Sequence, residues 1–324
     1  MFVIGIDVGN YDTKTQNTST PTGYEGPFSE KPPIAGEYLA VNGKYYIPTK
    51  TRFNYEKDKT QSERCIILSL FAIAKEIFYR ASSTKKDLSH ENIQKLIKNT
   101  QEIGIGVGLP PAHYTSARLT SLIEYYRKYL GKGLKFEWND YQFDIVMKTC
   151  KVYPQGAAGA VDPENTYRKD FPTYFVVDIG GYTVDVLKYV NDQLDGNWSS
   201  KEEGIITMYD DIIDKTMVNY DMTLDGSLLE DVLMNRKNVI PDDVVKFIKD
   251  KTKQHADNIV DLVRQLGVEF KAYPTLFLGG GSLLLEPYIL QNKIINPKAV
   301  LFLSDPCANA KGYAKFLQHE VTGK

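Results

Sequence analysis

Two stretches of the sequence interrupt a strand with residues that strands normally exclude. Residues 176–186 read VVDIGGYTVDV, and residues 1–14 read MFVIGIDVGNYDTK. In both, an apolar run reaches an Asp and then a Gly, and a Thr follows within a few positions. Gly packs no side chain in a strand and Asp resists burial, so each stretch is predicted to turn back on itself. Because the unit occurs twice, about half a chain apart, the sequence predicts two similar halves that each present one such hairpin.

The segments outside these hairpins alternate between strand-like and helix-like patterns. IGIGVGLPP is a predicted buried strand ended by two prolines, and PTLFLGGGSLLLEPYIL has the pattern of a strand, a triple-glycine turn and a helix. This alternation indicates an α/β fold with a largely parallel or mixed sheet. We expect one α/β domain over residues 1–155, completed by a C-terminal helix at about 308–324. A second domain is expected over 156–307, with a helical insertion at about 220–270.

Shorter segments carry local predictions. The Asn-Gly pair at 42–43 and the Asn-Asp pair at 139–140 predict the turns of two further β-hairpins. Residues 15–36 are polar and contain Pro and Gly, so we expect a loose stretch there. KVYPQGAAGAV (151–161) is expected to pass from a strand into a helix of small residues. ANAKGYAKF (308–316) has the same small-residue character, and the two segments would lie at the crossings between the halves.

Composition argues against several classes of protein. The net charge of -2 is unlike that of a chain with a dedicated nucleic-acid or anionic-membrane surface. The three cysteines lie far apart without a Cys-x-x-Cys pair, which argues against a zinc knuckle or a disulfide framework. No apolar run approaches the roughly 18–20 residues that span a bilayer. We therefore expect a soluble, cytoplasmic protein that binds neither nucleic acid nor membrane directly.

The first hairpin has the chemistry of a phosphate site. Gly9 and Asn10 tolerate positive φ, and a turn built on them would expose successive backbone N–H groups, which bind anions. The hydroxyl of Thr13 and the ammonium of Lys14 would add charge-assisted hydrogen bonds. Asp7 would repel a phosphate unless a cation stood between them, which suggests a phosphate together with Mg²⁺. Taken alone, the stretch is equally well interpreted as an ordinary Asp-Gly hairpin.

The second hairpin repeats this chemistry and strengthens the interpretation. Gly180 and Gly181 supply the turn, Thr183 a hydroxyl for a phosphate oxygen, and Asp178 a second carboxylate beside the same hydrated metal. Two such hairpins could hold a polyphosphate from both sides. Asp185 either faces the site or stabilises the turn, and the sequence leaves both open.

Two further segments complete the candidate site. The LGGGS segment, Gly279 to Ser282, lies at a strand-to-helix junction, where glycines and a helix N-terminus admit a flat group or a phosphate. It lacks the Gly-Lys-Ser/Thr of a P-loop, and a plain turn is the alternative. Gln155 could orient a water toward a phosphoryl group, although as a neutral amide it is a poor base. The alternative is that Gln155 is an ordinary helix-start residue.

The two hairpins, the LGGGS segment and the two small-residue segments follow one another along the chain in the order of the motifs of the actin, Hsp70 and sugar-kinase superfamily, and they resemble those motifs. IDVGNYDTK and DIGGYTVD resemble its two phosphate loops, LGGGS its adenosine loop, and PQGAAGA and ANAKGY its two connecting helices. The short chain, GLPPAHY and the EEGIITMYDDI helix look most like ParM-type actins. The resemblance implies an actin-like fold, with two similar α/β domains and mixed sheets around a nucleotide cleft.

The resemblance also implies roles for individual residues. Asp7 and Asp178 would hold Mg²⁺ through water, and Gln155 would orient the attacking water. The implied catalytic set is Gln155, Asp7 and Asp178, and the implied nucleotide contacts are Gly9, Asn10, Tyr11, Asp12, Thr13, Lys14, Gly180, Gly181, Tyr182, Thr183, Gly279, Gly280, Gly281 and Ser282. Tyr11 and Tyr182 are bulkier than the residues of many relatives at these positions.

The implied activity is that of an ATPase that binds ATP (or GTP) with Mg²⁺ and polymerises into nucleotide-dependent filaments. For a ParM-type protein, the filaments would segregate plasmid DNA through a DNA-binding adaptor, without direct contact between the chain and DNA. Two alternatives remain open from the sequence. One is a non-polymerising ATPase scaffold or switch on the same fold, and the other is a small-molecule kinase.

Overall fold

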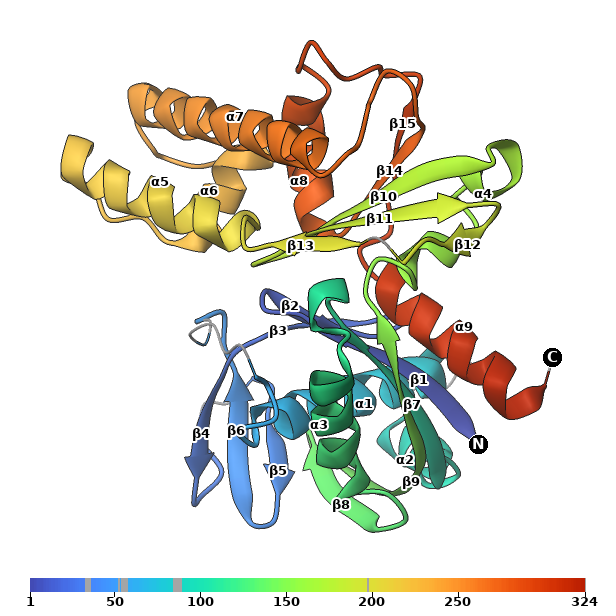
Figure 1. The fold of residues 1–324 in the computed structure, drawn as a ribbon. Coiled ribbons are helices and arrows are strands. Elements are labelled where there is room, and N and C mark those ends of the chain that lie inside the picture. Colours follow the sequence, from blue (N-terminus) through green and yellow to red (C-terminus); the bar gives the residue numbers. More distant parts are fainter. Residues whose placement is uncertain (33–35, 52, 54–57, 84–88, 197, 324) are drawn as a thin grey trace. The chain divides into compact units, whose positions relative to one another are not determined.

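The computed structural model describes residues 1–32, 36–51, 53, 58–83, 89–196 and 198–323 (Figure 1). The chain divides into two compact units. Unit 1 comprises Met1–Asp162 and Cys307–Lys324, and unit 2 comprises Pro163–Pro306. The helices within the described residues include none that is long and apolar enough to cross a membrane.

Unit 1 is built on a mixed sheet whose described strands lie in the order β3-β2-β1-β7-β9-β8-β5-β6-β4. The neighbours β1, β7 and β9 run parallel, and all other pairs are antiparallel. The strands are β1 (Phe2–Val8), β2 (Asp12–Lys14), β3 (Ser19–Pro21), β4 (Tyr24–Phe28), β5 (Leu39–Val41), β6 (Lys44–Pro48), β7 (Glu102–Leu109), β8 (Gly133–Trp138) and β9 (Tyr141–Pro154). The helical segments are α1 (Arg64–Ser83), α2 (His90–Lys98), η1 (Pro111–His113), α3 (Ser116–Arg127), η2 (Gly159–Val161) and α9 (Ala308–Thr322).

Helices cover both faces of this sheet because successive residues of a strand point to opposite sides. Ile4 and Ile6 of β1 belong to one core cluster with residues of α1, α2 and α3. Val3 belongs to another, with Tyr313 and Leu317 of α9. Gly5 lets α9 approach, since a Cβ there would lie 1.8 Å from the Ala310 carbonyl oxygen. The C-terminal helix is therefore an integral layer of unit 1.

Unit 2 has a smaller sheet whose described strands follow the order β12-β11-β10-β14-β15, with β13 paired to β11. Its centre is mixed: β10 is antiparallel to β11 and parallel to β14. The strands are β10 (Thr173–Ile179), β11 (Val184–Val190), β12 (Gln193–Leu194), β13 (Ser199–Lys201), β14 (Thr275–Leu278) and β15 (Val300–Phe302). The helices are α4 (Tyr167–Asp170), α5 (Ile205–Tyr220), α6 (Gly226–Leu233), α7 (Asp242–Gln265) and α8 (Gly280–Ile289).

The two predicted hairpins at 42–43 and 139–140 are confirmed. They connect β5 to β6 and β8 to β9 (Figure 1). Both residues of each turn have positive φ: 52° and 70° in the first turn, 48° and 66° in the second. This is the backbone of the type I′ turn, whose twist matches that of the flanking strands.

The loose stretch expected over residues 15–36 is wrong for its described part, which contains β3 and β4; residues 33–35 lie outside the described residues. Strand β3 was missed because it is short and polar. Its Thr20 pairs with Thr13 of β2, and both side chains are buried. A Thr-rich strand satisfies the sheet's preference for branched side chains without giving an apolar pattern.

The small-residue helix expected from 151–161 is also wrong. Strand β9 runs on to Pro154, and only the short η2 turn follows. Gly156 has φ +73°, outside the helical region. Asp162 precedes a proline and is extended, with ψ 139°, and a residue before proline is disfavoured in a helix. Small residues here allow close packing instead, because a Cβ on Gly312 of α9 would lie 2.0 Å from the Ala158 carbonyl oxygen.

Candidate functional site

The first hairpin joins β1 to β2, with Asp7 opposite Lys14 and Val8 opposite Thr13. Cross-strand partners share a face of the sheet, so Asp7 and Lys14 lie side by side at its edge. Neither Gly9 nor Asn10 has the positive φ that the sequence suggested. Gly9 is needed for another reason: a Cβ there would lie 2.5 Å from the Asp12 carbonyl oxygen.

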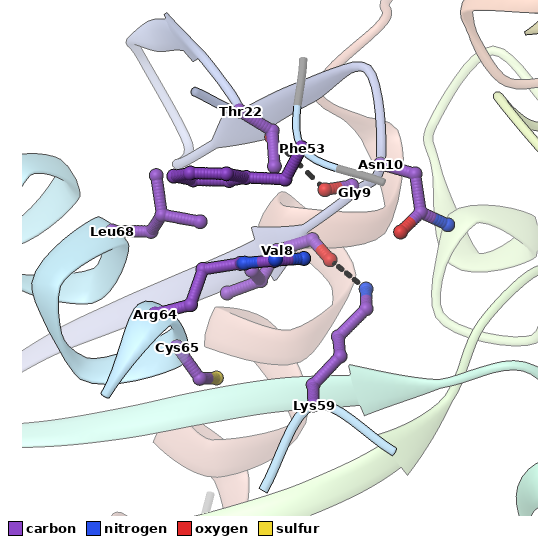
Figure 2. Close-up of a pocket in the computed structure, with 9 residues that line it drawn as sticks. All are labelled: Val8, Gly9, Asn10, Thr22, Phe53, Lys59, Arg64, Cys65 and Leu68. Carbon is purple, nitrogen blue, oxygen red and sulfur yellow. Dashed lines mark hydrogen bonds between the residues drawn. The ribbon is translucent and has the colours of Figure 1, made fainter. Parts of the chain in front are cut away.

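Carbonyl groups of this hairpin accept hydrogen bonds from Thr22 and Lys59 (Figure 2). Thr22 donates its hydroxyl to the Gly9 oxygen at 2.9 Å and its backbone N–H to the Tyr11 oxygen at 3.0 Å. Lys59 donates its ammonium to the Val8 oxygen. In a planar trans peptide the C=O and the next N–H point in opposite directions. The Gly9 N–H is therefore directed away from Lys59, and the Asn10 N–H away from the Thr22 hydroxyl.

Asp7 meets Gln155 at the end of the strand. The Gln155 side-chain amide donates from Nε2 to Asp7 Oδ1 at 2.9 Å, although the residues lie far apart in sequence. The Gln155 backbone N–H donates to the Leu109 oxygen of β7 at 2.8 Å. Asn309 of α9 holds the turn that follows, because its Oδ1 accepts from the N–H groups of Gly156 and Gly159 at 3.0 and 3.1 Å. Two predicted catalytic residues thus touch within unit 1.

The second hairpin joins β10 to β11 and is closed by a hydrogen bond from Gly180 N–H to the Thr183 oxygen at 2.8 Å. Its carbonyl groups face the first turn of α5. The N–H groups of Gly204, Ile205 and Ile206 donate to the oxygens of Tyr182, Gly180 and Gly181 at 3.0, 3.2 and 2.8 Å. A helix N-terminus has such unpaired donors to offer. By the same peptide geometry, the N–H groups of Gly181, Tyr182 and Thr183 are directed away from α5.

Asp178 and Asp185 are direct cross-strand partners and lie on the same face of the sheet. Both are buried, at 6% and 2% exposure. Asp185 accepts a long hydrogen bond of 3.4 Å from the Thr183 hydroxyl within the hairpin. The two carboxyl groups therefore lie next to each other at the buried end of this strand pair.

The triple-glycine turn begins α8 beside the second hairpin. Gly279 has φ +90°, and a Cβ there would lie 2.4 Å from Asp178 Oδ1. A Cβ on Gly281 would lie 2.7 Å from both Ile179 and Ile205. Ser282 is fully buried and donates its hydroxyl to the Gly279 oxygen at 2.8 Å. The turn therefore packs α8 against the Asp178 strand.

Some predicted contacts are placed inside a unit and not at its surface. The hydroxyl of Thr13 is buried and pairs with the Thr22 hydroxyl at 3.1 Å. Gly281 and Ser282 are likewise buried in unit 2. Asp178 is also buried. Gln155 is half-buried. The other predicted residues, on the two hairpins and at the glycine turn, are half-buried or exposed: Asp7, Gly9, Asn10, Tyr11, Asp12, Lys14, Gly180, Gly181, Tyr182, Thr183, Gly279 and Gly280.

No protein-family model matches the sequence, and no curated protein matches it. Solved structures share its fold along nearly the whole chain. A ParM filament from Clostridium botulinum gives a TM-score of 0.75 at 18% identity, covering 98% of this chain and 99% of that one. An archaeal actin homolog gives 0.73 at 18% identity, covering 98% and 100%. Bacillus thuringiensis ParM with ATP gives 0.62 at 13% identity, covering 99% and 100%.

The chain has an actin-like fold. The predicted fold class is therefore confirmed. The archaeal actin homolog is also solved in complex with ADP, at a TM-score of 0.70, 18% identity and 98% and 100% coverage. At these identities the likeness concerns the fold, so the site of this actin-like chain has to be argued from its own residues.

Sequence reasoning missed four residues of this actin-like chain that shape the candidate site: Thr22, Lys59, Gly204 and Asn309. Gly204 had a usable signal, because a Gly directly before an apolar helix often allows close approach. A Cβ on Gly204 would lie 2.4 Å from the Gly181 oxygen. Thr22 and Lys59 lie outside the recognised motifs. Asn309 lies in the ANAKGY segment, which was singled out only for its small residues.

Proposed function

We propose that the chain is a cytoplasmic ATPase that polymerises into nucleotide-dependent filaments and drives plasmid DNA segregation through a DNA-binding adaptor. The observation that carries the proposal is the contact between Gln155 and Asp7 at the foot of the first hairpin. The actin-like fold, shared with a ParM filament and with homologs solved with ADP and ATP, supports it.

In this proposal the outward N–H groups of both hairpins bind the phosphates of the nucleotide. Gly9 and Asn10 would supply them in unit 1, and Gly181 to Thr183 in unit 2. Lys14, which lies beside Asp7, would add a cation for the same phosphates. Phosphoryl transfer needs mainly positioning and electrostatic stabilisation, and both hairpins are fixed by hydrogen bonds before any ligand binds.

Mg²⁺ fits the chemistry of the residues present. Among the described residues, no group of three or more His, Cys, Asp or Glu could hold a metal. Mg²⁺ characteristically keeps several waters and uses one or two carboxylates together with substrate phosphates. Asp7 and Asp178 would hold it through water, as the sequence suggests. When bound, it would neutralise charge on the nucleotide phosphates.

Gln155 would orient the attacking water. Its Nε2 is committed to Asp7 Oδ1, so the direction of the whole side-chain amide is set. The carbonyl Oε1 at the other end of the amide can then accept a hydrogen bond from a water. A neutral amide positions the water without removing its proton, so hydrolysis would be slow and would depend on alignment.

The test combines turnover with assembly. Purified protein is incubated with Mg²⁺ and ATP, ADP or GTP, phosphate release is measured, and filaments are sought by sedimentation and electron microscopy. We expect phosphate release and filaments with ATP, and neither with the Asp178→Ala variant. Turnover without filaments over a broad concentration range would assign a switch or scaffold, and turnover that requires an added acceptor would assign a kinase.

The segregation role has its own test. With the net charge of -2, filaments alone are expected not to sediment with DNA. Addition of a DNA-binding protein encoded beside this chain should bring plasmid DNA into the pellet in an ATP-dependent manner. Sedimentation of DNA with the filaments alone would contradict the adaptor, and failure with the neighbouring protein would contradict the segregation role.

A further inference from the structure

The first hairpin closes one side of a small pocket (Figure 2). The pocket is lined by Val8, Gly9, Asn10, Thr22, Phe53, Lys59, Arg64, Cys65 and Leu68. The carbonyl oxygens of Val8 and Gly9 point into it, toward Lys59 and Thr22. Lys59 and Thr22 are thus the hydrogen-bond donors to these two carbonyl oxygens.

Lys59 is delivered to this position by a well-fixed turn. Asp58 accepts from the N–H and the hydroxyl of Thr60 at 3.0 and 2.6 Å, and from the Gln61 amide at 3.0 Å. The hydrogen bond from the Thr60 side chain lowers the pKa of Asp58 below its ordinary value. Such a side-chain turn restricts the backbone immediately before α1. The turn therefore restricts the backbone from which the Lys59 side chain extends to Val8.

The charge of Lys59 matters more than its bulk. The described lining of this pocket includes a second cation, Arg64, which stacks on the Phe53 ring at 4.1 Å. A hydrogen bond from an ammonium is roughly twice as strong as a neutral one. It also polarises the peptide that accepts it, so the N–H on the other side becomes a better donor. That N–H belongs to Gly9.

We propose that Lys59 is a positioning residue for phosphate binding. Its ammonium, bonded to the Val8 carbonyl, fixes and polarises the Gly9 N–H that faces the nucleotide phosphates. The proposal rests on the proposed function for its ligand, and on the contact between Lys59 and Val8 for its mechanism. It differs from the role of Lys14, which would contact phosphate directly. Lys59 acts through one peptide group, from the opposite side of the hairpin.

The test compares Lys59→Met, which keeps the bulk without the charge, with Lys59→Arg, which keeps the charge. Lys44→Met is the control, because Lys44 is an exposed lysine of the same unit. Dissociation constants for Mg-ADP and for a non-hydrolysable Mg-triphosphate analogue are measured by calorimetry at fixed salt. We expect Lys59→Met to weaken both about tenfold, Lys59→Arg to stay within about threefold of the wild type, and Lys44→Met to change neither.

A second readout needs no nucleotide. In the amide NMR spectrum of the nucleotide-free protein, Lys59→Met should move the Gly9 proton resonance upfield, while Lys44→Met leaves it in place. If the wild type binds no nucleotide, the proposed function fails, and the Gly9 resonance still decides the role of Lys59. Unchanged affinity in Lys59→Met would overturn the inference. So would an unchanged Gly9 resonance, or a loss of affinity that Lys59→Arg fails to rescue and that accompanies a lower unfolding midpoint.

Discussion

Replacement of Gly279 by Ala tests how the second hairpin is held. Gly279 has φ +90° and ψ 158°, a backbone conformation that is essentially restricted to glycine and costs other residues about 1–3 kcal/mol. The added Cβ would lie 2.4 Å from Asp178 Oδ1 and 2.6 Å from the Ile179 oxygen. Relief of such overpacking costs a further ~1–3 kcal/mol. We expect Gly279→Ala to lower the free energy of unfolding by about 2–6 kcal/mol.

Gly267 supplies a matched control in the same unit. Gly267 follows α7 and its φ of +98° also lies in the region that favours glycine, but no heavy atom lies within 4 Å of an added Cβ. Gly267→Ala should therefore show the backbone cost alone, about 1–3 kcal/mol. Urea unfolding followed by circular dichroism gives both values. Gly279→Ala should also weaken Mg-nucleotide binding, because Asp178 must move, whereas Gly267→Ala should not. Equal destabilisation by the two substitutions would refute the close contact with Asp178.

Three further predictions address separate parts of the molecule. Gln155→Ala should slow phosphate release about 100-fold yet leave nucleotide affinity within about threefold, because it removes only the orienting amide; an equal loss of both would make Gln155 structural. Glu76 of α1 is fully buried and accepts four hydrogen bonds, one of them from Arg80. Glu76→Ala should cost about 3–5 kcal/mol in urea unfolding, and a loss below ~1 kcal/mol would contradict that network. Burial lowers the pKa of His255 from 6.5 to about 4, so the unfolded chain binds this proton more tightly. Stability should fall as the pH drops from 6.5 toward 4, and the unfolding midpoint of His255→Gln should fall less over that range.

The strand-ending carboxylates could be predicted from sequence because local chemistry encodes them. An apolar run that meets Asp and then Gly must leave the sheet, and this placed Asp7 and Asp178 at the ends of β1 and β10. The sequence predicted that the turn needs Gly9 for a positive φ, and the structure shows a different requirement. Gly9 is required by the close Asp12 carbonyl and not by a positive φ. A glycine in a sequence signals an unusual demand without saying whether that demand is a dihedral angle or a contact.

Contacts between distant segments were beyond sequence reasoning. Gln155 reaches Asp7 because β1, β7 and β9 are parallel neighbours, so their carboxyl ends lie at one edge of the sheet. The register that sets this contact pairs Leu109 with Pro154, and no local pattern in either strand fixes it. Lys59 is a similar case. Its turn could be read from Asp58 and Thr60, but its acceptor on the first hairpin could not.

The two hairpins reach the same arrangement by different means. In unit 2, the carbonyl groups are held by backbone N–H groups at the start of α5, and this contact requires that Gly204 carry no side chain. In unit 1, two side chains, those of Thr22 and Lys59, take part in holding the carbonyl groups. Hydrogen bonds from backbone N–H groups persist through most side-chain substitutions. Hydrogen bonds from side chains can be removed or altered by a single substitution. If the chain binds nucleotide as proposed, substitutions around the first hairpin should change its affinity for phosphate more than substitutions around the second.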